Sequence, residues 1–437
     1  MNARRRWAYV VGALSFLARP GVGAAALPAP APSPSADSGS LTESDVFKMW
    51  LSQSREVASW RSAVGAARFD VVAARVLPNP TISLAGSYVL NGAPPDGVYN
   101  WGPQVSMPLP ILGQVAGRRD AAMAALRLAE VNVAVSIWQR AFEIQDAMRD
   151  RAFADAKVLT ISKNLDELAR IEEVVNKRVQ SGANSSYDVL RVGITSGTLR
   201  ASLAGALVDR DRADVRLVAL VNAANVVSLP VTRASLAHFH GPESEAALQS
   251  AAHERRPDLE LARRGIVAAE RTATRYRYEA VPVPTLFLGA YFTREQQSTS
   301  VQGGLSFPLP IFDRNQGQVG RAVAEAEGQR TLAAGLEDKI RAEVHGSWQA
   351  RADSKRALDE FRVGTLATVS ILIERAEVSY RAGGSFLIMD LLDAHRAGWD
   401  ARTQELELEH SFVDAECDLE HAAALVGIVP QSYNRAP

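Results

Sequence analysis

Two carboxylates beside a glycine pair have the residue type and spacing in this sequence that most favour chemistry. Asp390 and Asp393 follow Gly384 by six and nine positions, which places both on one face of a helix that begins after the glycines. Carboxylates that line a water-filled path favour cations and repel anions. The alternative is that acidic residues near a helix start simply complement its dipole.

An earlier segment shows the same arrangement with one change of charge. Asp188 follows Gly182 by six positions, but Arg191 occupies the place of the second carboxylate. This asymmetry predicts that a gate built from such residues forms in only one of the two segments.

Motifs of common enzyme classes do not occur. There is no Walker-type phosphate loop, GxSxG elbow or HExxH pair. His253-Glu254 begins the zinc-protease pattern, but Pro257 replaces its second histidine. His238 and His240 are better interpreted as a solvated loop than as a metal site. A single cysteine, Cys417, allows no intrachain disulfide. We therefore expect no enzyme activity, no cofactor and no resident metal.

The first 26 residues resemble a secretory signal. The basic Arg4–Arg6 precedes an apolar run, Trp7–Leu17, that is short of the ~20 residues needed to span a bilayer. No later stretch looks long and apolar enough to span as a helix. Residues 27–40 read as a Pro/Ala/Ser-rich leader and residues 431–437 as a C-terminal tail. No cysteine lies near the cleavage region, so no N-terminal lipid anchor is expected.

The chain contains an internal two-fold repeat, which we place at residues 41–230 and 231–430. The sequence VSMPLPI at Val105–Ile111 recurs as LSFPLPI at Leu305–Ile311, and two other landmarks recur in the same order. Each half is predicted to form a helix, a hairpin, a long helix, a break and a helix. The turns after the two hairpins are marked by Pro108, Pro110, Gly117, Pro308, Pro310 and Gly317.

Helical segments of unusual length are predicted. A helix is expected over Ser44–Arg75, stopped by Pro78. No proline occurs from Gln114 to Gln180, which allows a helix of roughly 100 Å at 1.5 Å per residue. Apolar residues in its later part, and in the matching part of the second half, have heptad-like spacing, which predicts packing on neighbouring helices.

The predicted hairpins, 81–107 and 285–307, alternate large apolar residues with small or polar ones. Phe287 and Tyr291 interrupt the pattern by falling on the polar face. Such alternation is typical of transmembrane β-strands and also of half-buried soluble sheets. Aromatic residues near the strand ends favour a membrane girdle: Tyr88, Tyr99, Trp101, Tyr291 and Phe292.

Four strands cannot close a barrel by themselves. Known single-chain barrels begin at about eight strands, and open sheet edges are not tolerated in lipid. The strand number therefore predicts a barrel shared between several chains.

The ordered landmarks resemble those of the TolC-like outer-membrane efflux family over nearly the whole mature chain. They are Asn79-Pro80, the two Pro-Leu-Pro turns and the Gly…Asp pattern at the helix breaks. The resemblance implies a mixed α/β membrane protein. It implies a trimeric transmembrane β-barrel, with four strands per chain, continued by a long α-helical coiled-coil barrel into the periplasm. The implied partners are two further copies, outer-membrane lipid, a periplasmic adaptor protein and an inner-membrane pump of the RND or ABC type; with a net charge of -1, no nucleic acid is expected.

The resemblance also assigns roles at the helix breaks. Asp390 and Asp393 would form the pore constriction at the periplasmic tip. The adaptor-docking region would contain Gly182, Asp188, Arg381, Gly383 and Gly384. The tip latch best known in the family needs an arginine and a tyrosine where this chain has Phe386 and Arg381, so that latch is not expected, although Arg381 could pair with a nearby carboxylate.

The cargo remains open between three classes. Pro308–Gly317 resembles a motif of the heavy-metal efflux branch, of the cobalt–zinc–cadmium type. Efflux of drugs or other small molecules is the alternative, and type I protein secretion is a third. In a different class, the chain could be a structural coiled-coil trimer or a soluble periplasmic protein.

Overall fold

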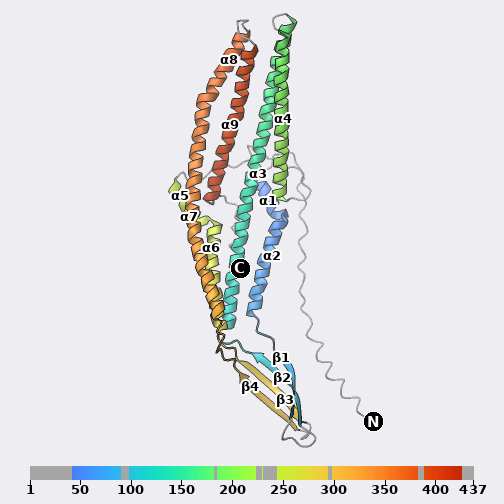
Figure 1. Cartoon of the computed structure of the whole chain (residues 1–437), viewed down its shortest axis with the longest axis vertical. Helices are drawn as coiled ribbons and strands as arrows, with labels where there is room; N and C mark the ends of the chain where they lie inside the picture. The colour runs from blue at the N-terminus through green and yellow to red at the C-terminus, as the bar shows by residue number, and fades with distance from the viewer. Residues whose placement is uncertain are drawn as a thin grey trace, which may run out of the picture. The chain divides into compact units, whose positions relative to one another are not determined.

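The computed structural model describes residues 42–89, 98–181, 185–222, 229, 244–293, 298–381 and 388–425. These residues belong to one compact unit, which is mostly helical with one small sheet (Figure 1). The repeat boundaries, signal, leader and tail are not tested by this architecture, and residues 1–41 and 426–437 lie outside the described part.

In the first half, the predicted helix over Ser44–Arg75 is two helices. α1 (Glu43–Gln53) and α2 (Arg55–Arg75) are separated at Ser54, whose backbone is extended with ψ 128°. The long helix is confirmed: α3 spans Gln114–Gln180 without interruption. α4 (Ser186–Val221) follows it.

The second half has a comparable order with a difference in its long helix. α5 (Glu245–Arg255) and α6 (Pro257–Glu279) precede the second hairpin. After the hairpin, α7 (Gln316–Phe361) passes through a π-helical turn, η2 (Arg362–Leu366), into α8 (Ala367–Arg381). α9 (Ile388–Ala422) completes the described helices. A π-turn changes the direction of side chains without ending the rod, and sequence periodicity did not predict it.

The four strands form one antiparallel sheet in the order β1-β2-β3-β4. β1 (Thr81–Val89) pairs with β2 (Val98–Pro108), and β3 (Thr285–Thr293) pairs with β4 (Ser298–Ser306). Pairing of β2 with β3 joins the two hairpins. β1 and β4 are therefore the edges of the sheet within the chain.

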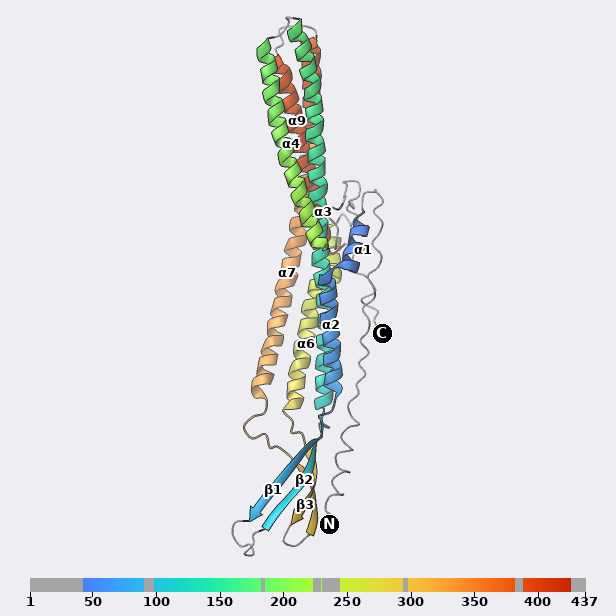
Figure 2. The same ribbon diagram turned by 90° about the vertical axis from the view of Figure 1, so that its right-hand side faces the viewer.

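The helices pack in an order that follows the strands. Nearest the sheet, α2 packs on α3, α3 on α6 and α6 on α7 (Figure 2). Toward the other end, α4 packs on α3, α3 on α9 and α9 on α8. Helices α2 and α4 thus bound one side of this unit, and α7 and α8 bound the other.

Three apolar clusters hold the helices together. The first surrounds the fully buried Trp50 and joins α1 and α2 to α3 and α4. The second joins α5, α7 and α9 around Leu248 and Leu419. The third lies between the ends of α3, α4, α8 and α9 and includes Leu168, Val175 and Tyr380 from the predicted heptad-like seams. Packing of these seams on neighbouring helices is confirmed.

One described helix, α3, is long and apolar enough to cross a membrane by length and composition, although the sequence analysis expected no such segment. A third of its most apolar window (33%) is buried against the rest of the chain, and the helix packs on α2, α4, α6 and α9. A packed core helix of a soluble region meets the same criteria.

Candidate functional site

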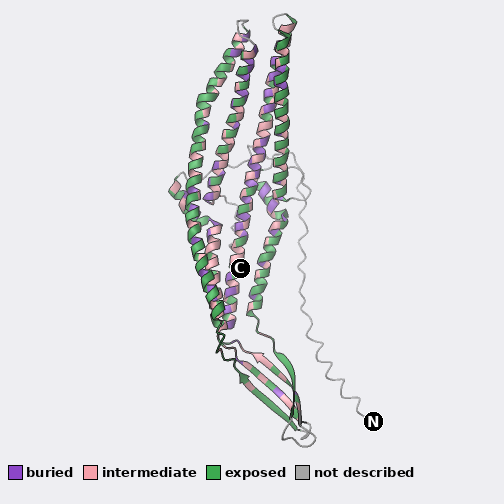
Figure 3. Ribbon diagram, viewed as in Figure 1, coloured by how far each residue is buried: buried purple, intermediate pink, exposed green. Residues whose placement is uncertain are grey.

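The sheet has one apolar and one polar face. The register aligns Ile82 with Val105, and Val105 with Leu288, so large apolar residues of adjacent strands share a face. These side chains are exposed; Leu84, for example, is 72% exposed (Figure 3). The exposed apolar residues of the strands are Ile82, Leu84, Tyr88, Trp101, Val105, Leu286, Leu288, Phe292, Val301 and Leu305. No described element covers this face.

The aromatic residues expected in one girdle divide between the two faces. Trp101 is paired with Phe292, and their ring centroids lie 5.3 Å apart on the apolar face. Tyr88 is exposed on the same face. Tyr291 lies on the opposite, polar face, one residue from Phe292, because side chains alternate along a strand. The girdle prediction was wrong for Tyr291.

The first strand-to-helix turn is built around an αL glycine. Gly113 has φ +93° and precedes α3, and the Gln114 side chain accepts a hydrogen bond from the Leu112 amide at 2.9 Å. The Leu109 amide after Pro108 donates to the Pro284 carbonyl at 2.7 Å, which ties the turn to the second half. Pro110 lies between these contacts and ends the strand geometry.

The second turn has the same construction, displaced in sequence. Asn315 takes the αL conformation with φ 61°, and the Gln316 side chain accepts from the Arg314 amide at 2.7 Å. Gln114 and Gln316 are 202 positions apart (316 − 114), whereas the Pro-Leu-Pro motifs, which include Pro308 and Pro310, repeat at 200 (308 − 108).

This displacement corrects the pairing of Gly117 with Gly317. A Cβ at Gly117 would lie 2.8 Å from the Tyr278 ring, so α3 approaches α6 closely there. A Cβ at Gly317 would meet nothing within 4 Å. The two glycines share a motif position but not a structural role.

The helix tip comprises the ends of α3 and α8 and the starts of α4 and α9 (residues 168–181, 185–195, 373–381 and 388–399). Asp390 lies in the first turn of α9, and Asp393 follows one turn later with its side chain 61% exposed and 3.7 Å from Arg396. Their placement is compatible with both interpretations made from the sequence.

Asp188 has a capping function in the first half. Its carboxylate accepts from the Ser185 amide at 3.1 Å, which completes a capping box at the start of α4. Arg191, in place of a second acid, donates to the Tyr187 hydroxyl at 2.9 Å and to the Met389 sulfur on α9. The two halves of the helix tip therefore contact each other through a residue that differs between them.

Arg381 does find a carboxylate, as expected: it donates to Glu377 one turn earlier at 2.9 Å. Gly182, Gly383, Gly384 and Phe386 lie outside the described residues, as does the His238–His240 pair.

A contact between the halves that the sequence did not predict closes the helix tip. Arg178, in the last turn of α3, donates to the Tyr380 carbonyl at 2.7 Å and places its guanidinium 4.2 Å from the centre of the Tyr380 ring. Tyr380 is only 4% exposed. We call this contact the Arg178–Tyr380 clasp. A basic residue at a helix end was the available signal, but its partner is 202 residues away.

A buried histidine lies beneath the clasp. His395 on α9 is 6% exposed, and its Nε2 is 3.5 Å from Glu377 Oε1 on α8. Burial lowers the pKa of the His395 imidazole, against the opposing effect of Glu377. Its neighbour Trp399 donates to Glu167 on α3 at 3.0 Å, and Arg402 pairs with the same carboxylate at 2.7 Å. These contacts join α3, α8 and α9.

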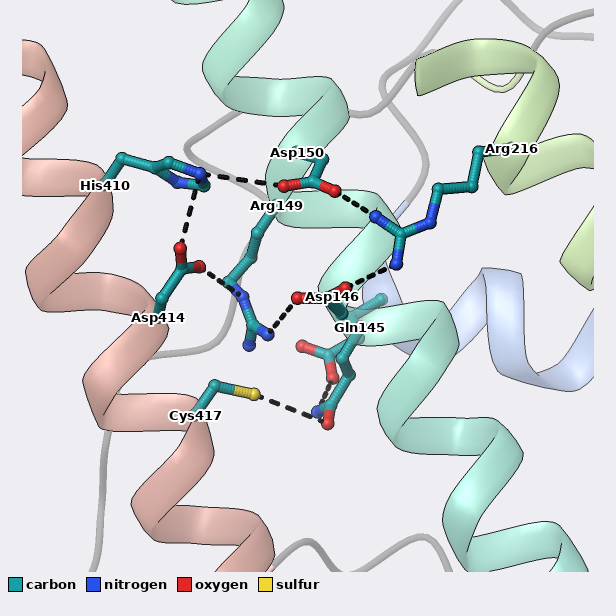
Figure 4. Close-up of polar contacts among 9 residues, drawn as sticks. Gln145, Asp146, Arg149, Asp150, Arg216, His410, Asp414 and Cys417 are labelled. Carbon is teal, nitrogen blue, oxygen red and sulfur yellow. Dashed lines mark hydrogen bonds and ion pairs between the residues drawn. The ribbon is translucent and has the colours of Figure 1, made fainter. Parts of the chain in front are cut away.

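An ion-pair network lies farther along α3 (Figure 4). Arg149, 6% exposed, pairs with Asp414 of α9 at 3.2 Å. Arg216 of α4 pairs with Asp146 at 2.6 Å and also with Asp150, which lies 3.6 Å from His410. These residues connect three helices and are a structural network.

Metal and thiol chemistry find no support among the described residues. They contain no group of three or more His, Cys, Asp or Glu side chains that could hold a metal ion. Burial raises the pKa of the Cys417 thiol to about 12, which keeps it protonated and unreactive.

The arrangement of a small sheet and long paired helices is that of outer-membrane efflux channels. The chain superposes on CusC, a transmembrane channel, with a TM-score of 0.72 at 18% identity, covering 91% of this chain and 97% of CusC. It superposes on the outer membrane protein VceC of Vibrio cholerae with a TM-score of 0.68 at 17% identity, covering 87% and 95%.

Sequence comparison leads to a family. Residues 46–223 match the family model described as outer membrane efflux protein. The chain is 24% identical over 348 residues to the cobalt-zinc-cadmium resistance protein CzcC of Cupriavidus metallidurans, covering 77% of this chain and 78% of CzcC. The chain belongs to the outer membrane efflux protein family, whose members are passive channels and not enzymes.

Proposed function

We propose that three copies of this chain form one outer-membrane duct, the exit channel of a tripartite efflux system. The observation that carries the proposal is the pair of unmatched sides described above. Each side combines a strand edge with helix edges: β1 with α2 and α4, and β4 with α7 and α8. A head-to-tail interface of this kind closes into a ring.

Exposed apolar side chains on both sides support this closure. Phe69 on α2 and Leu190 on α4 are 75% and 66% exposed, and Leu332 on α7 and Val378 on α8 are 66% and 60% exposed. Apolar patches of this kind mark protein interfaces. Twelve strands from three chains would also remove the open edges that lipid does not tolerate. The apolar sheet face would contact lipid and the polar face would contact water.

The helix tip is proposed as the constriction of this duct. Asp390 and Asp393 of three chains would surround one axis and favour cations. The Arg178–Tyr380 clasp would hold each chain in the closed arrangement. We further propose that Asp188, Arg381 and the glycines Gly182, Gly383 and Gly384 mark the region where a periplasmic adaptor docks, with an inner-membrane RND or ABC pump behind it.

Heavy-metal cations are the proposed cargo. The likeness to CzcC, a cobalt-zinc-cadmium resistance protein, supports this class, and so does the Pro308–Gly317 motif. Efflux of organic small molecules is the second candidate, favoured by the absence of charged residues from the described strands. The N-terminal 26 residues are proposed to direct export to the outer membrane.

A deletion strain tests the cargo. The strain, carrying either the unchanged gene or an empty vector, is grown against graded zinc, cobalt, cadmium, nickel, copper and silver, and against dyes, detergents and antibiotics. Sensitivity restricted to certain metals and reversed by the gene is the expected result. Sensitivity to organic compounds alone would replace the metal assignment, and no sensitivity to either class would contradict an efflux role.

A further inference from the structure

The polar face of the sheet carries two aromatic rings among small uncharged side chains. None of the described strand residues is Asp, Glu, Lys or Arg, on either face. Phe287 and Tyr291 of β3 are flanked on the same face by hydroxyl, amide and glycine residues of neighbouring strands. Those residues are Thr81, Ser83, Ser87, Asn100, Gly102, Gln104, Ser106, Ser300, Gln302 and Gly304.

The Phe287 ring lies flat against the next strand. Phe287 is paired with Gly304 of β4, and a Cβ on that glycine would approach the ring Cζ to 2.7 Å. The glycine therefore leaves the space that the ring occupies. The residue retains partial exposure, so the ring also borders the open side of the sheet.

The Tyr291 ring is oriented by a hydrogen bond. Its hydroxyl donates to Gln104 Oε1 of β2 at 3.2 Å, and Gln104 is paired with Gly289, two residues along β3. The ring thus leans along the sheet toward Gln104 and is partly exposed. This contact satisfies the hydroxyl and leaves the aromatic face available.

Two partly exposed rings on an uncharged face suit one kind of solute. A hydrated divalent cation gains nothing from this wall, because no described strand supplies a carboxylate. An organic cation that carries apolar groups can place its charge against an aromatic face and needs no counter-ion. An organic anion is repelled by the negative face of the same rings.

We propose that Phe287 and Tyr291 form a weak binding site for organic cations on the water-facing wall of the duct. The proposal rests on the proposed function, which makes this face the wall of a channel. It deepens that function by assigning the strand region an affinity for organic cations, separate from any cation preference of the helix tip. Weak contact is what conduction requires, because a solute must leave the site as readily as it enters.

Saturation-transfer NMR on the detergent-solubilised full-length protein tests this site. The probes are benzyltrimethylammonium and benzenesulfonate, which share a ring and differ in charge. Unchanged protein is expected to bind the cation more tightly than the anion. The paired substitution F287L/Y291L is expected to raise the dissociation constant of the cation about two- to five-fold.

Matched variants separate ring chemistry from folding. F292L makes the same change on the same strand but on the apolar face, against Trp101, and should leave binding unchanged. Y291F keeps the ring and loses the bond to Gln104, and should retain most of the affinity. Equal dissociation constants for unchanged protein and F287L/Y291L, or equal binding of the two probes, would overturn the proposal.

The mass of the protein in detergent is measured on the same samples. A trimer that fails to prefer the cation contradicts the binding site alone. A protein that stays monomeric contradicts the proposed function itself, whatever the probes do.

Discussion

The sheet and the helix tip are stabilised by opposite means. The described strands contain no charged residue and expose an apolar face, whereas the helix tip combines an apolar cluster with buried and partly buried ion pairs. An apolar exposed face is stable only in an apolar solvent, and ion pairs at helix ends can open and reform in water. The difference indicates that the strands form a fixed wall and the helix tip a reversible closure.

Charge on the exposed apolar face should give the largest effect. Leu84→Lys places an ammonium on a residue that is 72% exposed on that face. Lysine facing lipid near the bilayer midplane costs about 2–4 kcal/mol per chain, so outer-membrane yield should fall strongly. Ser83→Lys is the control, because the neighbouring side chain points to the polar face. Equal yields of the two variants by membrane fractionation would remove the distinction between the faces.

Loss of the Arg178–Tyr380 clasp should give the next largest effect. Arg178→Ala removes a charged hydrogen bond at 2.7 Å and the ring contact, together about 2 kcal/mol. We expect more frequent open events in planar bilayers. Lys177→Ala removes only an exposed pair with Glu173 and should behave like unchanged protein. Identical opening of R178A and K177A would show that the clasp does not hold the helix tip closed.

The acid pair should control selectivity more than stability. Asp390→Asn with Asp393→Asn keeps size and removes two charges per chain. Cation preference, measured as reversal potential across a salt gradient, should decrease. Asp353→Asn on α7, which removes an exposed charge paired with Arg356, is the control. A reversal potential unaffected by the double substitution would favour the simple helix-dipole interpretation of these acids.

The smallest effect should be a pH dependence of the helix tip. Burial lowers the pKa of His395 from the ordinary 6.5, so the folded tip favours the neutral imidazole. Its stability is complete above pH 6.5 and declines as pH falls below that value, because the unfolded state binds the proton first. The charged groups around His395 are Glu167, Arg170, Glu377, Arg381 and Arg402.

Opening frequency compared above and below this pH tests the prediction. His395→Gln should flatten the increase expected on acidification. His345→Gln, which alters a histidine with 57% side-chain exposure, should preserve it. An unchanged acid response in H395Q would assign the effect to other groups.

The regular elements were the most predictable parts of the chain. The limits of α3 follow from the proline-free run and the glycine before Gln114, and the alternating patterns locate the strands. The break at Ser54 and the π-turn at Arg362–Leu366 were missed, because neither contains a proline or a change of hydrophobic period.

The candidate site was less predictable, because its contacts join residues distant in sequence. The acids of the helix tip were visible from spacing, but the capping bond of Asp188 depends on local backbone geometry. The partners of Arg178 and His395 lie on other helices and are fixed only by packing. Equivalence of Gly117 and Gly317 failed because two extra residues precede the second long helix.

The mass of the purified protein in mild detergent, corrected for bound detergent by light scattering, tests the central claim most directly. Closure of the two unmatched sides predicts a particle three times the mass of one chain, recovered from the outer-membrane fraction. A monomer recovered from the soluble periplasm would contradict the account.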